Sequence, residues 1–327
     1  MDSRIARIFQ NKKQVSCGTH DGKFHTDELV AIALILQCFG DKCAMNIIRT
    51  RDAEVLASCD IVLDVGYKNH GKYFDHHGRD FDETHPDTKF KLATTGIVWY
   101  DIKDILLDKL SLGNQPTDVR EMALELIHKR IILPTDADDN GQFGARATGP
   151  QPMTLPEIVN SFNVSVTDNQ YADQAFAECL SLIRIILDHK FLSVVRQATE
   201  QRRILSAMLN ASPQDMQDGI FVLKEAGPWI SVVLNNWEDT LPFKLCITPG
   251  NDDHSWRIQT FPGSRYDRRS MRCGAPVWMR GYQKNVNPLV ENIDVIFVNK
   301  DGFIGAVEGT LEQAKEFARL WISQSEN

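Results

Sequence analysis

Short apolar runs alternate with helix-like segments through residues 13–133, and this order constrains the fold more than any other feature. The runs "KQVSCGTH", "CDIVLDVG" and "KYFDHHG" are typical of strands, whereas "DELVAIALILQCFG", "GIVWYDIKDILLDKL" and "TDVREMALELIHKRIIL" have helical periodicity. Near-continuous apolar runs are typical of parallel strands, because helices cover both faces of a parallel sheet. The alternation therefore predicts an α/β domain with a mostly parallel sheet and helices on both faces.

The second half of the chain has a different pattern. Residues 171–210 contain no proline or glycine, so they are predicted to form one long connecting helix. The segments "GIFVLKE", "PWISVVLNN", "FKLCITPG", "SWRIQTFPG" and "IDVIFV" then read as strands, followed by the glycine-bearing loop "DGFIGAVEG" and a closing amphipathic helix. We expect a first domain at residues 1–209, ending in the long helix, and a smaller α+β domain at residues 210–327.

Composition excludes several classes of protein. The formal net charge of −8 provides no broad basic surface of the kind that binds duplex nucleic acid nonspecifically. The seven cysteines are dispersed and form no CxxC pair, which indicates free thiols in a reducing compartment. No apolar run reaches the roughly 18 residues of a membrane span. We expect a soluble protein of the cytoplasm or nucleus, in which the basic start "MDSRIARIFQNKKQ" is either a solvated segment or a weak mitochondrial signal.

Side chains that can bind metals gather at four predicted strand ends. They are His20, Asp21, His25, Asp27, Glu28, Asp64, Asp75, His76, His77, Asp136, Asp138, Asp139 and Asn140. Taken singly, a loop histidine is usually solvated and an aspartate before a helix is usually a cap. Taken together, they lie where the loops of an open α/β sheet converge on a ligand.

The chemistry of this set favours two metal ions. Imidazole with carboxylate suits manganese, iron or zinc, and the set is too rich for one ion. Two ions sharing a carboxylate activate a bridging water and bind a phosphoryl group, which indicates hydrolysis of a phosphoester or phosphoanhydride. The sequence has no P-loop, no GxGxxG, no nucleophile elbow and no HExxH, so motors, dehydrogenases, serine hydrolases and zincin proteases are not supported.

At these residues the chain resembles the DHH phosphoesterase superfamily, named for the triplet seen here as Asp75, His76 and His77. More narrowly, "GTHDGKFHTDELVA", "VLDVG", "YFDHHGRDF", "KLATTGIVW", "DADDNG", "SWRIQ" and "GFIGA" follow the order of the MYG family of metal-dependent exonucleases. The resemblance covers nearly the whole chain.

The resemblance implies a role for each residue. The implied metal ligands are His20, His25, Asp27, Asp64, His76 and Asp136, with Asp64 bridging two ions. His77 would face the substrate phosphate, Asp75 would orient a histidine, and Asp139 and Asn140 would serve the turn only.

The resemblance also implies that the second domain acts as a lid that contacts the substrate. Its segment "RYDRRSMRCGAPVWMRGYQ" is the densest basic run of the chain, and guanidinium groups suit phosphate oxygens. The substrate-binding candidates are Arg280, Arg265, Arg269, Gly302 and Gly305, the two glycines because they leave room for backbone amides near a phosphate.

The resulting hypothesis is a dinuclear phosphodiesterase that uses two Mn²⁺ ions, or Mg²⁺ or another divalent metal, and a metal-bridged hydroxide. Its expected activity is 3′-to-5′ exonuclease action on single-stranded RNA, a direction and a sugar that the resemblance alone implies. One alternative is hydrolysis of a small compound such as pyrophosphate, a bisphosphate nucleotide or a dinucleotide. A second is a metal-binding regulatory protein without turnover.

Overall fold

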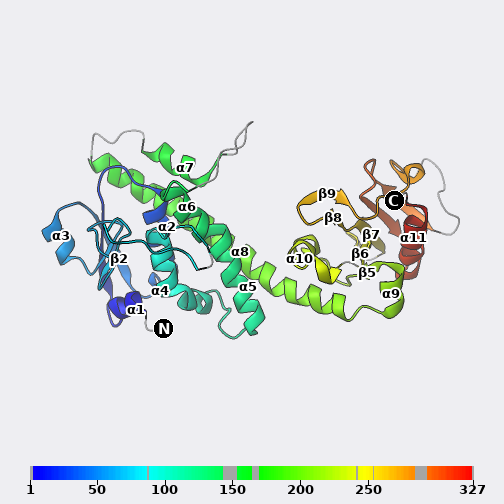
Figure 1. The fold of residues 1–327 in the computed structure, drawn as a ribbon, viewed down its shortest axis with the longest axis horizontal. Coiled ribbons are helices and arrows are strands. Elements are labelled where there is room, and N and C mark those ends of the chain that lie inside the picture. Colours follow the sequence, from blue (N-terminus) through cyan, green and yellow to red (C-terminus); the bar gives the residue numbers. More distant parts are fainter. Residues whose placement is uncertain are drawn as a thin grey trace. The chain divides into compact units, whose positions relative to one another are not determined.

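The computed structural model describes residues 3–86, 88–142, 153–163, 169–240, 242–252, 254–283 and 293–325. The chain divides into two compact units, Met1–Ala198 and Thr199–Asn327 (Figure 1). The division falls inside helix α8 (Asn169–Leu209), a helix of 41 residues. The boundary predicted between residues 209 and 210 corresponds to the end of this helix.

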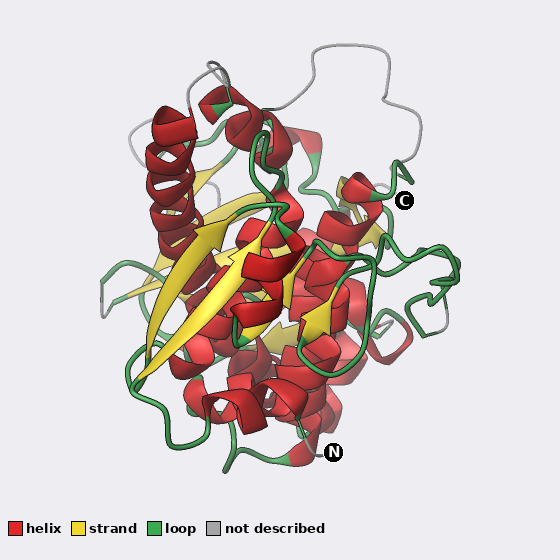
Figure 2. Ribbon diagram, turned by 90° about the vertical axis from the view of Figure 1, so that its left-hand side faces the viewer, coloured by secondary structure: helices red, strands yellow, loops and turns green. Residues whose placement is uncertain are grey.

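A parallel sheet organises the first unit. Its strands are β1 (Gln14–Thr19), β2 (Ala44–Arg49), β3 (Ile61–Leu63) and β4 (Tyr73–Phe74), in the order β2-β1-β3-β4. Every neighbouring pair is parallel, and Figure 2 shows the strands side by side among the helices. Strand β2 was not among the predicted runs.

Helices cover both faces of this sheet. The helices of the first unit are α1 (Arg4–Phe9), α2 (Thr26–Phe39), α3 (Ala53–Ser58), α4 (Thr94–Lys109), α5 (Thr117–Ile127), the π-helix η1 (His128–Ile132), α6 (Leu133–Asp139) and α7 (Leu155–Phe162), of which α2, α3 and α4 contact the strands. Successive residues of a strand point to opposite faces. Val62 accordingly packs with Leu56 of α3, while Ile61 and Leu63 join the large core built around α2. The predicted α/β class is confirmed.

Helices α2 and α4 are the elements that position the site. Helix α2 is buried on nearly all sides, which explains why its sequence is apolar around the whole helix. It packs against α4 and α6, and these two helices also contact each other. The three helices are adjacent in Figure 1.

The second unit is a smaller α+β domain. Its main sheet has the order β10-β11-β7-β6-β5, formed by β5 (Ile220–Val222), β6 (Leu245–Pro249), β7 (Ser255–Thr260), β10 (Asp294–Val298) and β11 (Ile304–Glu308). A hairpin of β8 (Pro262–Ser264) and β9 (Asp267–Met271) and the segments α9 (Pro213–Asp218), α10 (Trp229–Asn235), η2 (Glu238–Thr240), η3 (Val277–Met279) and α11 (Leu311–Gln324) complete it. Phe317 and Trp321 of α11 are fully buried in its core.

Two local predictions in this unit were wrong. The segment "PWISVVLNN" contains helix α10 rather than a strand. The predicted glycine loop "DGFIGAVEG" contains strand β11, which pairs with both β10 and β7. None of the described helices combines the length and the apolarity needed to cross a membrane.

Candidate metal centre

Three strands of the first unit deliver acidic or imidazole groups to one edge of the sheet. His20 follows the last residue of β1, Asp64 follows β3, and Asp75 follows β4. Because the strands are parallel, their carboxyl ends meet at the same edge. Side chains that are far apart in the sequence therefore lie together.

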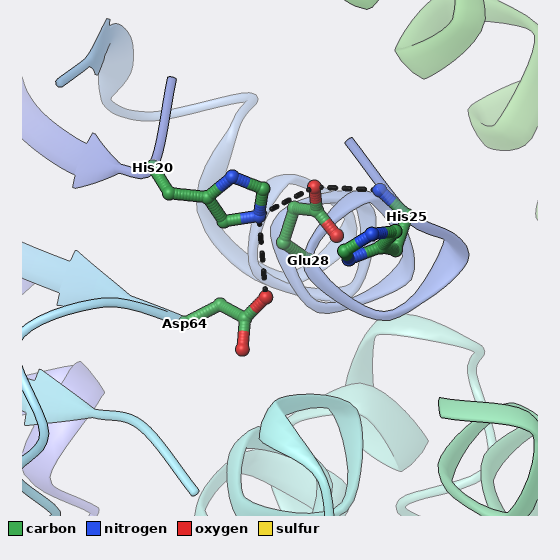
Figure 3. Close-up of side chains that lie close together, drawn as sticks. All are labelled: His20, His25, Glu28 and Asp64. Carbon is green, nitrogen blue, oxygen red and sulfur yellow. Dashed lines mark hydrogen bonds and ion pairs between the residues drawn. The ribbon is translucent and has the colours of Figure 1, made fainter. Parts of the chain in front are cut away.

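The first group of potential ligands contains His20, His25, Glu28 and Asp64, which each offer an atom within 4.8 Å of the others. His20 Nε2 lies 3.1 Å from Glu28 Oε1 and 3.5 Å from Asp64 Oδ2. Figure 3 shows the His20 ring directed at both carboxylates. His25 precedes the first turn of α2, and its backbone N–H donates to Glu28 Oε1 over 2.8 Å.

Asp64 is shared by a second group, which also contains His76 and His77. His76 Nε2 lies 3.4 Å from Asp64 Oδ1, and His77 Nδ1 lies 3.5 Å from the same oxygen. A third group contains Asp27, His76 and Asp139, in which His76 Nε2 lies 3.1 Å from Asp139 Oδ2. The acid Asp64 and the imidazole His76 thus connect adjacent groups, an arrangement suited to two neighbouring ions.

Asp64 has a backbone conformation that is uncommon for a residue with a side chain. Its φ of 57° lies in the left-handed region, which aspartate tolerates better than most residues. The Thr94 hydroxyl at the start of α4 donates to Asp64 Oδ1 over 3.0 Å. Backbone and hydrogen bond together fix this carboxylate.

Burial and charge act in opposition at the site. Burial alone would lower the pKa of His20, but hydrogen bonds to Asp64 and Glu28 raise it to about 10. Burial likewise opposes protonation of His76, whose pKa Asp139 and Asp64 raise to about 11. Burial opposes ionisation of Asp64, yet His20 and His76 hold its pKa well below the usual range. Burial, and then the charge of Asp139, raise the pKa of Asp27.

The donor set fits divalent metal ions. Glu28 Oε2 and His76 Nε2 are buried atoms with no suitably oriented hydrogen-bond partner among the described residues, although an unsatisfied buried polar atom is costly. Several acids also lie close together under low exposure, and a cation would offset their repulsion. Mixed imidazole and carboxylate ligands favour manganese, iron or zinc over calcium.

Asp75 and His77 form a pair at the rim of these groups. Asp75 is buried, and its Oδ1 lies 2.8 Å from His77 Nδ1 and accepts from the His77 backbone N–H over 3.0 Å. The His77 side chain is 51% exposed, which leaves its outer edge accessible. The hydrogen bond with Asp75 raises the pKa of His77, so the ring is favoured as a donor.

A cavity of about 520 Å³ opens beside these groups. Its lining includes His25, Asp27, His76, His77 and Asp139. This volume lies within the range of small-ligand pockets. The cavity can therefore receive a phosphate-bearing group next to the potential ligands.

Asp136 lies outside the three groups in the described structure. It is fully buried, and its carboxylate accepts the backbone N–H groups of Ala93 and Gly96 at the start of α4. His85 Nε2 lies 3.0 Å from Asp136 Oδ2. Asn140, predicted to serve the turn, donates from Nδ2 to the Asp136 carbonyl oxygen over 2.9 Å.

The predicted substrate-binding residues belong to the second unit. Arg280 Nε donates to the Ala275 carbonyl oxygen over 2.7 Å, and a Cβ added at Gly302, where φ is +75°, would lie 2.7 Å from Arg280 Nε. Arg280 and Gly302 are thus in contact. Arg265 is exposed in the turn between β8 and β9, and the side chain of Arg269 lies outside the described part of the structure.

Gly305 has a different setting from Gly302. It lies within β11 and pairs with Val298 and Ile258. A Cβ at this position would lie 3.2 Å from Trp321 Cζ3. The surroundings of Gly305 are therefore those of a close packing contact between strand and helix.

Three members of the groups were not predicted to be metal ligands: His77, which was expected to face the substrate phosphate, Glu28 and Asp139. Glu28 was among the metal-capable side chains but was assigned no ligand role, and it occupies the third position of α2, where a glutamate commonly caps a helix. Asp139 was assigned to the turn, but it is the last residue of α6 and faces His76. Asp136 and Asp139 are three residues apart, and this spacing places two residues of a helix on the same face. The spacing was the feature of the sequence that could have indicated a role for Asp139.

Comparison with solved structures gives low overall similarity. RecJ from Thermus thermophilus in complex with Mn²⁺ is 12% identical with a TM-score of 0.24, over 96% of this chain and 54% of that chain. This chain thus spans about half the length of RecJ. An exopolyphosphatase-related protein from Bacteroides fragilis is 11% identical with a TM-score of 0.25, over 98% of this chain and 97% of that chain.

Three sequence relatives match over most of their own length. A MYG1 protein of Schizosaccharomyces pombe is 29% identical over 96% of this chain and 99% of its own. Proteins named MYG1 exonuclease from Mus musculus and Homo sapiens are each 30% identical over 94% of this chain, covering 84% and 85% of their own lengths. The MYG1_exonuc model, described as uncharacterised protein family UPF0160, matches residues 16–322. The chain therefore belongs to the MYG1 exonuclease family, as its motifs predicted.

Proposed function

We propose that this chain is a metal-dependent phosphodiesterase that removes nucleotides from the 3′ end of single-stranded RNA. The observation that carries the proposal is the sharing of Asp64 between two groups of potential metal ligands at one edge of the sheet. The names of the mouse and human relatives support exonuclease action. The cavity beside the groups supports a phosphate-bearing substrate.

The chain's residues have distinct roles in this proposal. His20, His25, Glu28 and Asp64 would hold one ion, and His76, Asp27 and Asp139 with Asp64 would hold the other. When bound, two divalent ions such as Mn²⁺ or Mg²⁺ lower the pKa of a water and offset phosphate charge. The buried walls of the site keep these ligands in fixed positions, which reduces reorganisation during the reaction.

His77 would act on the substrate directly. Its Nδ1 contacts Asp75, so its remaining nitrogen, Nε2, is available at the exposed edge of the ring. A protonated ring can donate to a nonbridging phosphate oxygen or give a proton to the leaving oxygen. Asp75 holds the ring in place for either step.

The test is hydrolysis by the purified chain of a 5′-labelled single-stranded RNA, beside pyrophosphate and a dinucleotide, with Mn²⁺ or with chelator. A Mn²⁺-dependent ladder of shortened RNA is expected, because removal from the 3′ end preserves the label. Immediate release of a labelled mononucleotide would show that degradation starts at the 5′ end instead. Hydrolysis of only the small compounds would indicate a small-molecule phosphohydrolase instead of a ribonuclease. Hydrolysis of none of them would indicate a metal-binding protein without catalytic activity.

Two variants with the same substitution make this test specific. Asp64→Asn should abolish hydrolysis of every substrate, whereas Asp80→Asn should match the wild type. Asp80 is exposed and belongs to none of the three groups. Equal activity of both variants would mean that hydrolysis does not require Asp64 and would contradict the proposed metal-dependent mechanism.

A further inference from the structure

Two buried carboxylates hold the amino end of helix α4. The Asp27 carboxylate accepts the N–H of Thr94 over 2.9 Å and that of Thr95 over 2.7 Å. The Asp136 carboxylate accepts the N–H of Ala93 over 2.9 Å and that of Gly96 over 3.0 Å. The N–H groups at a helix start have no partner within the helix. Here all four consecutive donors are taken by side chains from α2 and α6.

The same helix end contacts the shared acid of the metal centre. The Thr94 hydroxyl donates to Asp64 Oδ1 over 3.0 Å, and the Thr95 hydroxyl donates to the Asp27 carbonyl oxygen over 2.8 Å. The first turn of α4 is therefore in direct contact with Asp27 and Asp64. A displacement of this turn would move both acids.

Asp136 is built into this arrangement with little freedom. A Cβ added at Gly96 would overlap Asp136 Oδ2, so the absence of a side chain at Gly96 is what admits the carboxylate. Both Asp136 oxygens accept backbone N–H groups. Asp139, which follows on the same helix, is the residue that faces His76.

A buried histidine contacts the far side of Asp136. His85 is fully buried, and its Nε2 lies 3.0 Å from Asp136 Oδ2. The other ring nitrogen, Nδ1, lies 2.9 Å from His128 Nε2 and 3.3 Å from the Tyr100 hydroxyl. The His85 backbone N–H also donates to the Phe90 carbonyl oxygen over 2.9 Å. His85 is thus fixed from several sides with one ring nitrogen held beside Asp136.

We propose that His85 and Asp136 are positioning residues, which hold the amino end of α4 so that Thr94 and the backbone of the first turn place Asp64 and Asp27 for metal binding. This role rests on the proposed metal-dependent function. In this proposal Asp139 is the metal ligand that α6 supplies. Asp136 binds backbone N–H groups and does not contact an ion. Groups that orient metal ligands from behind typically change metal affinity by about 10 to 100-fold when they are lost.

The test measures Mn²⁺ binding to the purified full-length chain by calorimetry, with the thermal unfolding of the metal-free chain recorded in parallel. His85→Leu should weaken Mn²⁺ binding by about 10-fold or more, while His85→Gln, which retains an N–H near the Nε2 position, should stay within about 3-fold. His189→Leu is the matched control, because His189 is exposed on α8. Its Mn²⁺ affinity should equal that of the wild type.

Three further variants separate positioning from direct ligation. Asp139→Asn should lose one of two bound ions, whereas Asp136→Asn should keep both with weakened affinity. The reverse pattern would overturn the proposal, because Asp136 would then be the ligand. Thr94→Val removes only the hydroxyl contact to Asp64 and should also weaken Mn²⁺ binding, so this variant keeps the test valid if His85→Leu does not fold.

The remaining outcomes are equally decisive. A purely structural role would lower the unfolding temperature of His85→Leu and leave its Mn²⁺ affinity unchanged, which would overturn the proposal. A wild-type chain without Mn²⁺ binding would overturn both this role and the proposed function. A wild type that binds two Mn²⁺ ions but leaves RNA intact would remove the RNA substrate alone, and the binding data would still decide the role of His85.

Discussion

His77 and Asp75 form a contact at the rim of the candidate metal centre, beside its cavity. Their Nδ1 and Oδ1 atoms are 2.8 Å apart, with Asp75 buried and His77 half-exposed. The two residues are the first and last of the "DHH" triplet, and the chain turns between them so that the Asp75 carboxylate also accepts the His77 backbone N–H. This short loop directs the second histidine towards the cavity.

Loss of the His77 ring should affect turnover more than metal content. His77→Ala and Asp75→Asn are each expected to lower kcat by at least about 10-fold, because the donor is removed or loses its orientation. Steady-state kinetics with Mn²⁺ and metal analysis of the same samples make the check. Loss of an ion from His77→Ala would instead make His77 a metal ligand.

Asp64→Asn should remove metal binding while the fold persists. The charge shared by the groups of His20 and His76 is lost, whereas asparagine retains the shape and accepts the left-handed backbone. We expect the metal content to fall and hydrolysis to become undetectable, with an unchanged circular dichroism spectrum. Normal turnover by this variant would refute a dinuclear mechanism.

Arg280→Ala should mainly raise KM. Its guanidinium lies against Gly302 in the loop between β10 and β11, and guanidinium groups suit phosphate oxygens. An increase in KM of about 10-fold, with kcat changed less than about 2-fold, is expected for an RNA substrate, in line with a lost charged hydrogen bond. Lys190→Ala, on an exposed position of α8, is the control, and an equal effect there would indicate nonspecific loss of charge.

Gly96→Ala should destabilise the first unit. The added Cβ would overlap Asp136 Oδ2, and overpacking of this kind costs about 1 to 3 kcal/mol. Urea unfolding in the presence of chelator measures the free energy of unfolding without any contribution from metal. Asp104→Ala, at an exposed position of α4, should change it by less than about 0.5 kcal/mol. Equal stability of the Gly96 variant and the wild type would mean that the helix end is loosely packed.

The cysteines should be unreactive in the native chain. All seven are free and buried, and burial raises the pKa of Cys38 to about 12 and that of Cys179 to about 11. Since the thiolate is the reactive form, a thiol reagent at a pH of about 8 should label almost none of them. All seven should react after denaturation, and rapid labelling of the native chain would reveal an accessible thiol.

The sequence predicted the fold best where the period of apolar residues and the order of strands and helices determine the structure. His20, Asp64 and the DHH triplet each come at the end of a short apolar run. The parallel sheet and the gathering of His20, Asp64 and His76 could therefore be predicted. Strand β2 was missed because "AMNIIR" lies at the sheet edge, where its burial pattern is only intermediate. Segment "PWISVVLNN" was misread because its valines and isoleucine favour strands, while the surrounding core accommodates them in a helix.

The different contacts of Asp136 and Asp139 depend on the tertiary structure. Both residues lie on α6 in the same acidic run, and nothing local distinguishes a carboxylate that meets backbone amides from one that meets an imidazole. The difference comes from α4, a helix from a distant part of the sequence that begins at Thr94. Glu28 received no metal role for the same reason, since its contact with His20 also crosses between elements.

The left-handed backbone of Asp64 limits which residues evolution can place at the centre of this site. Glycine, asparagine and aspartate tolerate a φ of 57° with the least cost, whereas β-branched residues are strongly disfavoured. The genetic code separates asparagine from aspartate by a single nucleotide. A single-nucleotide change therefore exchanges the Asp64 carboxylate for an amide that the same turn accommodates, and it removes the negative charge that two groups of potential ligands share.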